Sequence, residues 1–368
     1  MAYYFKLPPI TDLTIGQQAA LNEPNAIAIS GGPGTGKSVV SLWRHIRNYG
    51  TDGKRSLLLT YTKTLESYLS LSSISEANNA NSVLEKEKIN NASLNVNRTL
   101  WWLTHGPTKY DELIVDEAQD VDSNKYIALG RYSDIISFGA DDGQIVFPRN
   151  STTERQLREI FKNNKTYFLD ENFRNSYQIV YFLKGFFSNK LIYQYILEDL
   201  KQKGRFGPKP ILISNINKFE KQHNVIVEII KLFFTDTESE NNTHNLAILL
   251  PLKRDVDSVF FALSESKINN RTIRCTRYYE GLTFNGISNI HVTTFKSAKG
   301  LEFDTVIIPE FDKYKWNVEN LTIAPITESD YYVAISRAKR NLYLLSNGVP
   351  EFLERSEQQK LTYSKEIL

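Results

Sequence analysis

Short apolar runs and amphipathic stretches alternate along this chain of 368 residues. The run NAIAIS (25–30) is almost continuously apolar, which is typical of a strand covered on both faces in a parallel sheet. From Val39 to Tyr49 the apolar residues recur every three or four positions, a helical spacing that ends at Gly50. The pattern therefore predicts a strand, a turn and a helix within the first 50 residues.

Further apolar runs in the second half of the chain predict a second sheet. These runs are KPILISN, NLAILLP, NIHVTTF, DTVIIPE and NLYLLS, and KFEKQHNVIVEIIKLFF between the first two has the spacing of an amphipathic helix. Alternating strands and helices imply parallel sheets. We expect one strand–helix domain at 1–166, a second at 167–348 and a charged C-terminal tail at 349–368. The polar, asparagine-rich stretch at 74–95 is expected to be a surface excursion with a short helix at most.

Composition narrows the class of protein. The chain is 41% hydrophobic and 23% charged, a balance typical of globular proteins, and no apolar run approaches the length of a membrane span. The start has no secretion signal, and Cys275 is the only cysteine, so we expect a cytosolic protein without an intrachain disulfide. No Cys/His spacing indicates a structural zinc site. A net charge of +2 neither requires nor excludes a nucleic-acid partner.

The turn after the first strand carries the first chemical motif. GGPGTGKS, from Gly31 to Ser38, fits G-x-x-x-x-G-K-[ST], in which glycines let backbone N–H groups converge on phosphates. Lys37 would neutralise the β- and γ-phosphates, and Ser38 would ligate Mg²⁺. The alternative is a glycine-rich loop without a ligand, but the flanking strand and helix favour a nucleoside triphosphate site. The expected binding residues are Gly32, Pro33, Gly34, Thr35, Gly36, Lys37 and Ser38.

The stretch DELIVDEAQDVD supplies carboxylates at the end of another predicted strand. Asp116 can hold Mg²⁺ through water, and Glu117 is placed to orient or deprotonate an attacking water. An acidic loop after a strand is the alternative. Together with the glycine turn, these carboxylates predict hydrolysis of a nucleoside triphosphate.

GGPGTGKS and DEAQD together resemble motifs of the UvrD/Rep-type superfamily 1 helicases, and the other motifs of that family follow in order from about residue 10 to 347. The resemblance implies an α/β P-loop NTPase with two RecA-like parallel-sheet domains and the ATP site in the cleft between them. It also implies residues around ATP. Gln17 of LTIGQQAAL would read the adenine, Phe173 of LDENFRNS would stack on it, and Glu302 of SAKGLEFD would bond the ribose. Gln144 of ADDGQIVF would sense the γ-phosphate.

The same resemblance assigns two arginine fingers and a nucleic-acid groove. Arg174 and Arg337, the latter in VAISRAK, would stabilise the transferring phosphoryl group through their fixed charge. Tyr61 could stack on a base or be a half-buried residue at a strand end, and the two tryptophans of NRTLWWL could belong to the core instead of the groove. The residues expected to contact the strand are Thr60, Tyr61, Thr62, Thr99 and Thr294.

The sequence also departs from the family. The intervals that usually hold large inserted subdomains are short, the expected tryptophan after Phe147 is absent from FPRNS, and Lys296 stands where the family has a histidine. These departures leave the ATPase motifs intact and put strand separation in doubt. The leading hypothesis is an ATP- and Mg²⁺-dependent helicase or translocase on single-stranded nucleic acid, more DNA than RNA, moving 3′ to 5′. The alternative is an ATP-driven switch with a protein partner such as a nuclease, in repair or phage defence. A metabolic kinase fits DEAQD and two arginine fingers less well.

Overall fold

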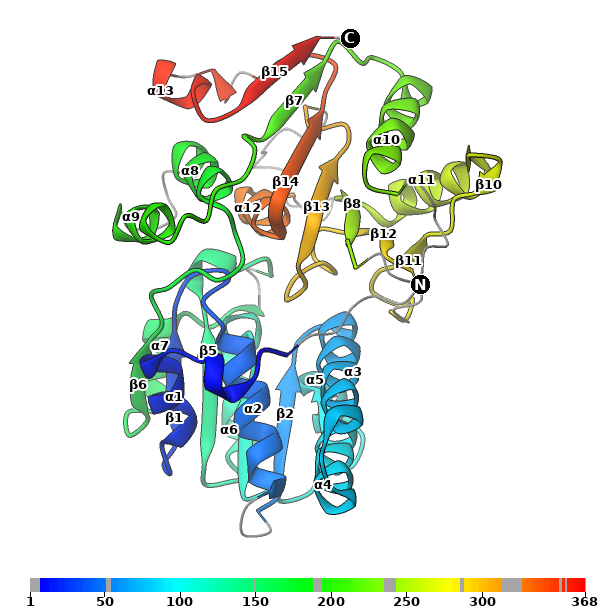
Figure 1. The fold of residues 1–368 in the computed structure, drawn as a ribbon. Coiled ribbons are helices and arrows are strands. Elements are labelled where there is room, and N and C mark those ends of the chain that lie inside the picture. The colour runs from blue at the N-terminus through cyan, green and yellow to red at the C-terminus, as the bar shows by residue number, and fades with distance from the viewer. Residues whose placement is uncertain are drawn as a thin grey trace. The chain divides into compact units, whose positions relative to one another are not determined.

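The computed structural model describes residues 7–50, 54–147, 150–187, 194–234, 243–284, 288–312, 326–350, 353–354 and 356–367. The chain divides into two compact units, which we call the N-terminal unit (Phe5–Phe173) and the C-terminal unit (from Arg174 onward). Each unit contains its own parallel sheet flanked by helices (Figure 1). The predicted α/β class with two parallel-sheet domains is therefore confirmed.

The N-terminal sheet has six parallel strands in the order β3-β2-β4-β5-β1-β6. Parallel pairing places the carboxyl ends of all its strands at one edge, which is where the phosphate-loop and DEAQD motifs begin. The strands are β1 (Ile27–Ser30), β2 (Ser56–Thr60), β3 (Val96–Arg98), β4 (Glu112–Val115), β5 (Ile136–Ala140) and β6 (Lys165–Phe168).

Helices cover both faces of this sheet because alternate strand residues face opposite sides. Ile27, Ile29 and Leu58 pack in one core with residues of α2, α3 and α4, whereas Leu57 and Leu59 pack in the other with residues of α5, α6 and α7. The helices are α1 (Ile15–Asn22), α2 (Lys37–Gly50), α3 (Lys63–Asn79), α4 (Val83–Leu94), α5 (Thr99–Thr104), α6 (Ser123–Leu129) and α7 (Glu154–Ile160), with short 3₁₀ turns η1 (Ile10–Asp12), η2 (Ala118–Asp120) and η3 (Asp142–Gln144).

The prediction for 74–95 is wrong. This stretch contains the end of α3 and the whole of α4, which pack against each other (Figure 1). The cap of α4 is Ser82, whose side chain accepts a hydrogen bond from the backbone N–H of Glu85. The helix buries only Ile89, Ala92 and Ser93. So few apolar positions give no helical periodicity in the sequence, and packing decides the structure here.

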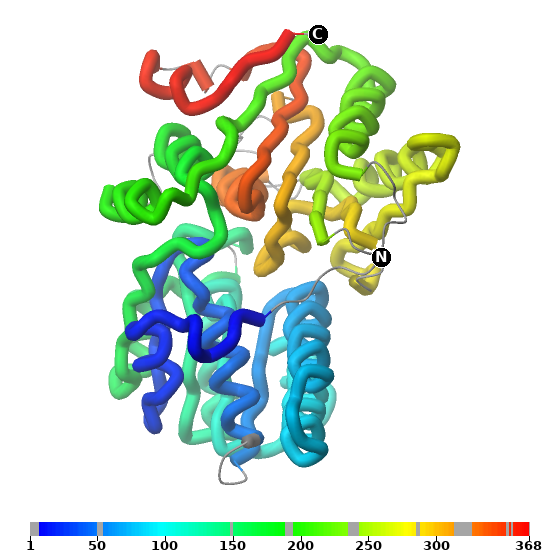
Figure 2. Tube along the Cα trace, viewed as in Figure 1, coloured from blue at the N-terminus to red at the C-terminus, as the bar shows by residue number. Residues whose placement is uncertain are grey.

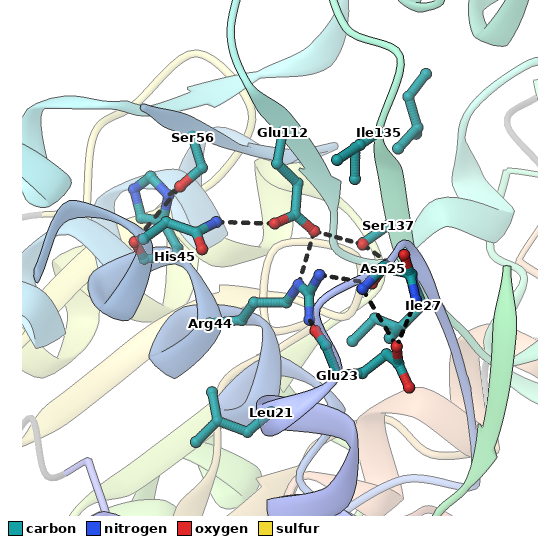
Figure 3. A network of polar contacts seen from close by, with 12 residues as sticks. Leu21, Glu23, Asn25, Ile27, Arg44, His45, Ser56, Glu112, Ile135 and Ser137 are labelled. Atoms are coloured by element: carbon teal, nitrogen blue, oxygen red, sulfur yellow. Dashed lines mark hydrogen bonds and ion pairs between the residues drawn. The ribbon is translucent and has the colours of Figure 1, made fainter. Parts of the chain in front are cut away.

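A buried ion pair fixes α2 to the end of the sheet opposite the motifs (Figure 3). The Nε of Arg44 lies 2.6 Å from Oε1 of Glu112, and the side chains of Ser137 and Asn48 also donate to this carboxylate, over 2.5 and 2.8 Å. Another nitrogen of Arg44 donates to the carbonyl of Glu23 over 2.6 Å. These bonds hold the helix that begins with the lysine of the phosphate loop.

The C-terminal sheet has seven parallel strands in the order β11-β12-β8-β13-β14-β7-β15. The five apolar runs predicted as strands form β7, β8, β12, β13 and β14, as expected. Its strands are β7 (Ile211–Ser214), β8 (Leu246–Leu250), β11 (Thr276–Tyr278), β12 (Ile290–Thr294), β13 (Phe303–Ile308), β14 (Ala338–Leu345) and β15 (Ser364–Ile367), with a separate hairpin of β9 (Lys267–Ile268) and β10 (Arg271–Thr272).

The helices of this unit are α8 (Tyr177–Phe186), α9 (Gln194–Gln202), α10 (Phe219–Phe233), α11 (Lys253–Glu265), α12 (Glu328–Ser336) and α13 (Glu357–Lys360). Residues of α10 and α11 share one core with β7, β8 and β12, and α8 and α12 both contact β14. Across the described parts of the chain, no helix combines the length and apolar character needed to cross a membrane.

The structure draws both domain boundaries differently from the sequence. The N-terminal unit extends to Phe173, not Thr166, because β6 pairs with β1 and so belongs to the first sheet. The tail is part of the C-terminal unit, where β15 pairs with β7 (Figure 2). The side chain of Gln359 also donates to the carbonyl of Gly185 over 2.8 Å. Contacts with segments distant in sequence hold these residues in place.

Candidate ATP and nucleic-acid site

The phosphate loop lies between β1 and α2, as the sequence predicts. Gly34 and Gly36 have φ angles of 76° and 87°, which glycine adopts without steric penalty. A Cβ at Gly36 would collide with the amide nitrogen of Gln17. Glycine is therefore required at Gly36 both by backbone conformation and by the close approach of a side chain.

Lys37 lies at this loop, and its ammonium is close to Asp141. Its Nζ donates to the carbonyls of Gly31 (2.6 Å) and Gly32 (2.9 Å) and lies 3.8 Å from Oδ2 of Asp141. The residue is only 7% exposed. The ammonium is thus held among oxygen atoms at the loop, where it could exchange its carbonyl contacts for phosphate oxygens.

Gln17 has a role that the sequence did not indicate. Its amide nitrogen donates to the carbonyl of Thr35 over 2.9 Å, and its oxygen accepts from the N–H of Thr14 in a capping box at the start of α1. Both ends of the amide therefore hold α1 against the phosphate loop. Reading an adenine would require exchange of these bonds, and that contact stays a prediction.

Asp116 and the first turn of α2 converge on Gly139 of β5. A Cβ at Gly139 would lie 3.5 Å from Oδ1 of Asp116 and 3.6 Å from Cβ of Lys37. Ser38 is half-buried in the same turn. Mg²⁺ in phosphoryl-transfer sites commonly takes one or two carboxylates together with substrate phosphates, so the hydroxyl of Ser38 and the carboxylate of Asp116 are suitable donors once a nucleotide supplies the rest. No cluster of three or more His, Cys, Asp or Glu suited to a metal occurs among the residues described.

Glu117, the predicted base, belongs to a chain of buried hydrogen bonds. Its backbone is in the left-handed region (φ 53°), which is uncommon outside glycine and is often found at functional sites. Oε2 of Glu117 accepts from Nε2 of Gln119 over 2.6 Å, and Oε1 of Gln119 accepts from the N–H of Asp141 over 3.2 Å. Gln144 donates to Oδ2 of Asp141 over 2.6 Å. The chain thus connects Glu117 to Gln144 and, through Asp141, to Lys37.

The threonines expected to contact nucleic acid lie inside the protein. Thr60 and Thr99 are both 0% exposed; the hydroxyl of Thr60 donates to the carbonyl of Thr62, and that of Thr99 donates to the carbonyl of Thr60. Both hydroxyls thus bond backbone carbonyls near the ends of β2 and β3, and the predicted contact of Thr60 and Thr99 with nucleic acid stays a prediction. Thr62 caps α3, and Thr294 bonds Ser297, so both hydroxyls are also occupied.

Tyr61 is half-buried and packs on Phe147, with ring centroids 4.5 Å apart and planes inclined by 42°. The two rings follow β2 and η3, so the contact joins the segment after β2 to the loop of Gln144. Phe147 thus provides an aromatic ring beside Tyr61, although the family tryptophan is absent. Pro148 and Arg149, which stand in the FPRNS departure, lie outside the described residues.

Phe173 ends the N-terminal unit beside the phosphate loop. Its N–H donates to the carbonyl of Gly34 over 2.8 Å, and the preceding Asn172 donates to the carbonyl of Pro33 over 3.2 Å. The residue is 41% exposed. An aromatic ring held at this loop with an accessible surface fits the predicted stacking on a nucleotide base.

In the C-terminal unit, cations surround Glu302. Nε of Arg174 lies 3.1 Å from Oε2 of Glu302, and Nζ of Lys339 lies 3.7 Å from its Oε1. Burial raises the pKa of Glu302, but Arg174, Lys339 and Arg337 outweigh burial, so the pKa lies below the ordinary value. Glu302 therefore pairs with the predicted arginine finger, and its bond to a ribose stays a prediction.

Arg337 is 1% exposed and bonded within its own unit. Its guanidinium donates to the carbonyls of Val333 (3.0 Å) and Leu301 (3.3 Å) and to the hydroxyl of Ser336 (2.9 Å). A contact with phosphate would need some of these bonds to be exchanged. The finger role stays a prediction for this residue.

Two residues that the sequence analysis did not select, Gln119 and Asn175, hold predicted site residues in position. Gln119 stands inside DEAQD, a motif that could have directed attention to it. Asn175 follows Arg174 directly, is 0% exposed, and donates to the carbonyls of Ser336 (2.9 Å) and Ala338 (2.6 Å). Asn175 thus holds the segment of Arg174 against that of Arg337, a contact between residues far apart in sequence that no local pattern indicates.

Comparisons with known proteins match this chain to helicase families. A family model described as "Schlafen group 3, DNA/RNA helicase domain" matches residues 24–210, about half of the chain, and one described as "UvrD-like helicase C-terminal domain" matches residues 279–348. The putative ATP-dependent DNA helicase R568 of Acanthamoeba polyphaga mimivirus is 25% identical over 250 residues, which cover 63% of this chain and 34% of that protein.

Two further similarities either cover a smaller share of this chain or have a low TM-score. The RecBCD enzyme subunit RecB of Chlamydia pneumoniae is 37% identical over 70 residues, which cover 19% of this chain and 6% of that protein. The arterivirus nonstructural protein 10 helicase, solved in complex with DNA, aligns with 11% identity over 94% of this chain and 65% of that chain, at a TM-score of 0.39. The chain therefore spans about a third or less of the two curated relatives.

Proposed function

This chain belongs to the Schlafen group 3 DNA/RNA helicase domain family, within the superfamily 1 helicases, and from this premise we propose that it hydrolyses ATP with Mg²⁺ to move along single-stranded nucleic acid. The single observation that carries the proposal is the bonded chain from Glu117 through Gln119 and Asp141 to Gln144 and Lys37. It links the group that would handle water to the group that would hold phosphate.

The hydrolytic step divides among these residues. Lys37 would balance the charge of the β- and γ-phosphates, while Glu117 would accept a proton from the attacking water as its oxygen approaches the γ-phosphorus. Gln119 donates to one oxygen of Glu117 and so fixes the direction of the carboxylate. Mg²⁺, held by Ser38 and Asp116, would neutralise charge on the phosphate oxygens.

We assign Arg174 and Arg337 the role of arginine fingers toward the γ-phosphate. A guanidinium keeps its charge and can bridge two equatorial oxygens, which suits the developing charge of the transition state. Replacing either with alanine should lower turnover by roughly 10³-fold or more while nucleotide affinity falls far less. Equal losses of affinity and turnover would identify them as ground-state ligands.

We propose that the substrate is single-stranded DNA in preference to RNA. We also propose that the protein moves 3′ to 5′ and is located in the cytosol. Support comes from the family and from the Tyr61–Phe147 ring pair, because an aromatic surface can stack on any base. Tyr61→Ala should weaken strand binding by about 1–3 kcal/mol and leave the melting temperature nearly unchanged. Unaltered strand binding with a large drop in melting temperature would assign Tyr61 to the core.

The deciding experiment is ATP turnover with and without single-stranded DNA and RNA oligonucleotides of the same sequence. We expect strand stimulation in the wild type, no turnover in Lys37→Ala, and ATP binding with very slow turnover in Glu117→Gln. Exposed Glu87, on α4, provides a control as Glu87→Gln, which should match the wild type. Wild-type turnover in Glu117→Gln would overturn the assignment of the base.

One observation favours a second candidate, an ATP-driven switch that signals to a protein partner such as a nuclease in repair or phage defence. The hydroxyls of Thr60, Thr62, Thr99 and Thr294 all bond within the protein, which leaves fewer groups to hold a strand. Turnover that rises with a partner protein and not with any oligonucleotide would support the switch over the motor.

A further inference from the structure

The segment Thr152–Glu154 lies outside every motif, yet it bonds the DEAQD loop, the loop of Gln144 and the end of β1. It leads into α7, after the loop of Gln144. The N–H of Thr152 donates to the carbonyl of Gln119 over 3.0 Å, and its hydroxyl donates to the carbonyl of Val121 over 2.6 Å. Thr152 is 0% exposed, so the segment is firmly attached to the DEAQD loop.

Glu154 makes the other two connections. Its N–H donates to Oδ1 of Asp142 over 2.7 Å, in η3 between Asp141 and Gln144. Its side chain accepts from the hydroxyl of Ser30 over 2.5 Å. Ser30 is the last residue of β1 and directly precedes the phosphate loop. One residue thus bonds both to the loop of Gln144 and to the strand from which the phosphate loop begins.

A simpler explanation is that Glu154 only complements the positive end of α7. That explanation predicts a carboxylate in solvent, but the side chain is 20% exposed and directed at Ser30. The backbone at this end of the helix is already capped by Thr153 and Gln156. Burial raises the pKa of Glu154, and Asp142 and Asp141 raise it further, while Ser30 and Arg158 lower it. An ionised carboxylate in such surroundings has a higher free energy than one in solvent, which favours a functional role for Glu154.

We propose that Glu154 is a positioning residue of the ATPase reaction, which couples the loop of Gln144 to the phosphate loop through its bond to Ser30. The inference rests on the proposed ATPase function. When Gln144 and Asp142 shift on γ-phosphate binding or release, Glu154 transmits the shift to the end of β1. A nucleic-acid strand that binds and moves the Tyr61–Phe147 pair acts on the phosphate loop by the same route.

The test is a double-mutant cycle on the Ser30–Glu154 hydrogen bond. The variants are Ser30→Ala, Glu154→Ala, their combination and Glu154→Gln, with Glu159→Ala as the matched control on the same helix. Glu159 is 63% exposed and pairs only on the surface with Arg155. The readouts are kcat and KM for ATP, with and without a single-stranded DNA oligonucleotide, the affinity for a fluorescent ATP analogue, and the melting temperature.

We expect Glu154→Ala to lower kcat about tenfold with a smaller change in KM, and the double variant to be no worse than either single one, as for directly coupled residues. Glu154→Gln should restore most of the activity because its amide oxygen still accepts from Ser30. Additive losses, a Gln variant no better than Ala, or a Glu154→Ala variant equal to Glu159→Ala would overturn the proposal.

The cycle also separates this inference from the proposed function. It is read on basal turnover and on analogue affinity, so the coupling of Ser30 and Glu154 can be measured even when no oligonucleotide stimulates the enzyme. Absence of stimulation in the wild type would count against the nucleic-acid motor alone. If the loss of activity in the variants is proportional to the fall in melting temperature, and the ratio of kcat to analogue affinity is unchanged, Glu154 has a purely structural role.

Discussion

At the scale of single residues, Asp141 is the centre of the N-terminal site. It receives hydrogen bonds from Gln144 and the backbone of Gly143, donates its N–H to Gln119, and lies 3.8 Å from the ammonium of Lys37. Hydrogen bonds that join buried polar side chains to one another in this way favour a rigid arrangement. Replacing one of these hydrogen-bonded residues should therefore also change the position of the residues that it bonds.

Gln119 allows a sharp test at this scale. Gln119→Ala removes the donor to Glu117 and should lower turnover about tenfold or more, a part of the roughly 10²–10⁴-fold that a positioned general base contributes. Affinity for ATP should change little, since the side chain of Gln119 bonds Glu117 and the backbone of Asp141 and not the phosphate loop. Single-turnover hydrolysis and analogue binding measure the two effects.

Gln119→Glu distinguishes orientation from space-filling. A carboxylate has nearly the same shape but cannot donate to Glu117, so it should be at least as damaging as alanine. Normal turnover in Gln119→Glu would contradict an orienting role.

At the scale of elements, α2 joins the chemistry to the stability of the N-terminal unit. It begins with Lys37 and is held two turns later by the buried pair of Arg44 and Glu112. Removing one member of a buried pair leaves an uncompensated charge. We therefore predict that Arg44→Met lowers the free energy of unfolding by about 3–5 kcal/mol.

Chemical denaturation followed by circular dichroism measures this loss. The matched control is Arg155→Met, at an arginine that is 88% exposed and pairs with Glu159 on the surface, where the loss should be below about 1 kcal/mol. Similar losses for the two arginines would show that the pair of Arg44 contributes no more than a surface ion pair.

The edge strand β6 is tied to the end of α1 by Glu23, which predicts a dependence on pH. Lys165, the N–H of Asn25 and the hydroxyl of Tyr167 lower the pKa of Glu23 from 4.5 to about 2. A depressed folded-state pKa stabilises the fold above pH 4.5, and that stability is lost as the pH falls toward 2. Glu23→Gln should therefore melt at a lower temperature than wild type near pH 7, and the gap should narrow as the pH falls from 4.5 toward 2.

Melting curves from pH 7 to pH 2.5 provide the measurement. Glu87→Gln, on the exposed side of α4, should show no gap at any pH. A gap for Glu23→Gln that stays constant with pH would mean that its carboxylate titrates normally in the folded protein.

At the scale of the whole molecule, the described elements are nearly all accounted for by two sheets and the helices that cover them. The pair α3 and α4 occupies the first interval in which the family usually carries an inserted subdomain, and strands and helices of the C-terminal sheet occupy most of the second. Little described structure remains to form a wedge at a duplex junction.

We therefore predict strand-stimulated ATPase activity with little or no unwinding by the chain alone. A single-turnover strand-displacement assay on DNA and RNA duplexes with 3′ or 5′ tails checks this, with strand-stimulated turnover measured in the same samples. Efficient unwinding by a demonstrated monomer would contradict the prediction and would direct attention to α4 or α9 as the wedge.

The phosphate loop, the DEAQD segment and the central strands could be predicted because each depends on residues close together in sequence. A buried strand reveals itself by a continuous apolar run, and a phosphate turn by its glycines and lysine. Parallel pairing then brings the motif ends to one edge of the sheet. For these features the sequence by itself determined the local structure and the chemistry.

Tertiary structure decided the features that depend on distant partners. Ser30 and Glu154 are 124 residues apart, so no local pattern indicates their bond, and α4 has too few apolar residues for a helical period. Thr60 and Thr99 are polar residues of a type that could contact a ligand at the surface, yet each hydroxyl donates to a backbone carbonyl in the interior. A side chain's type limits what it can bond, but only the packing of remote segments determines which partner it meets and whether water reaches it.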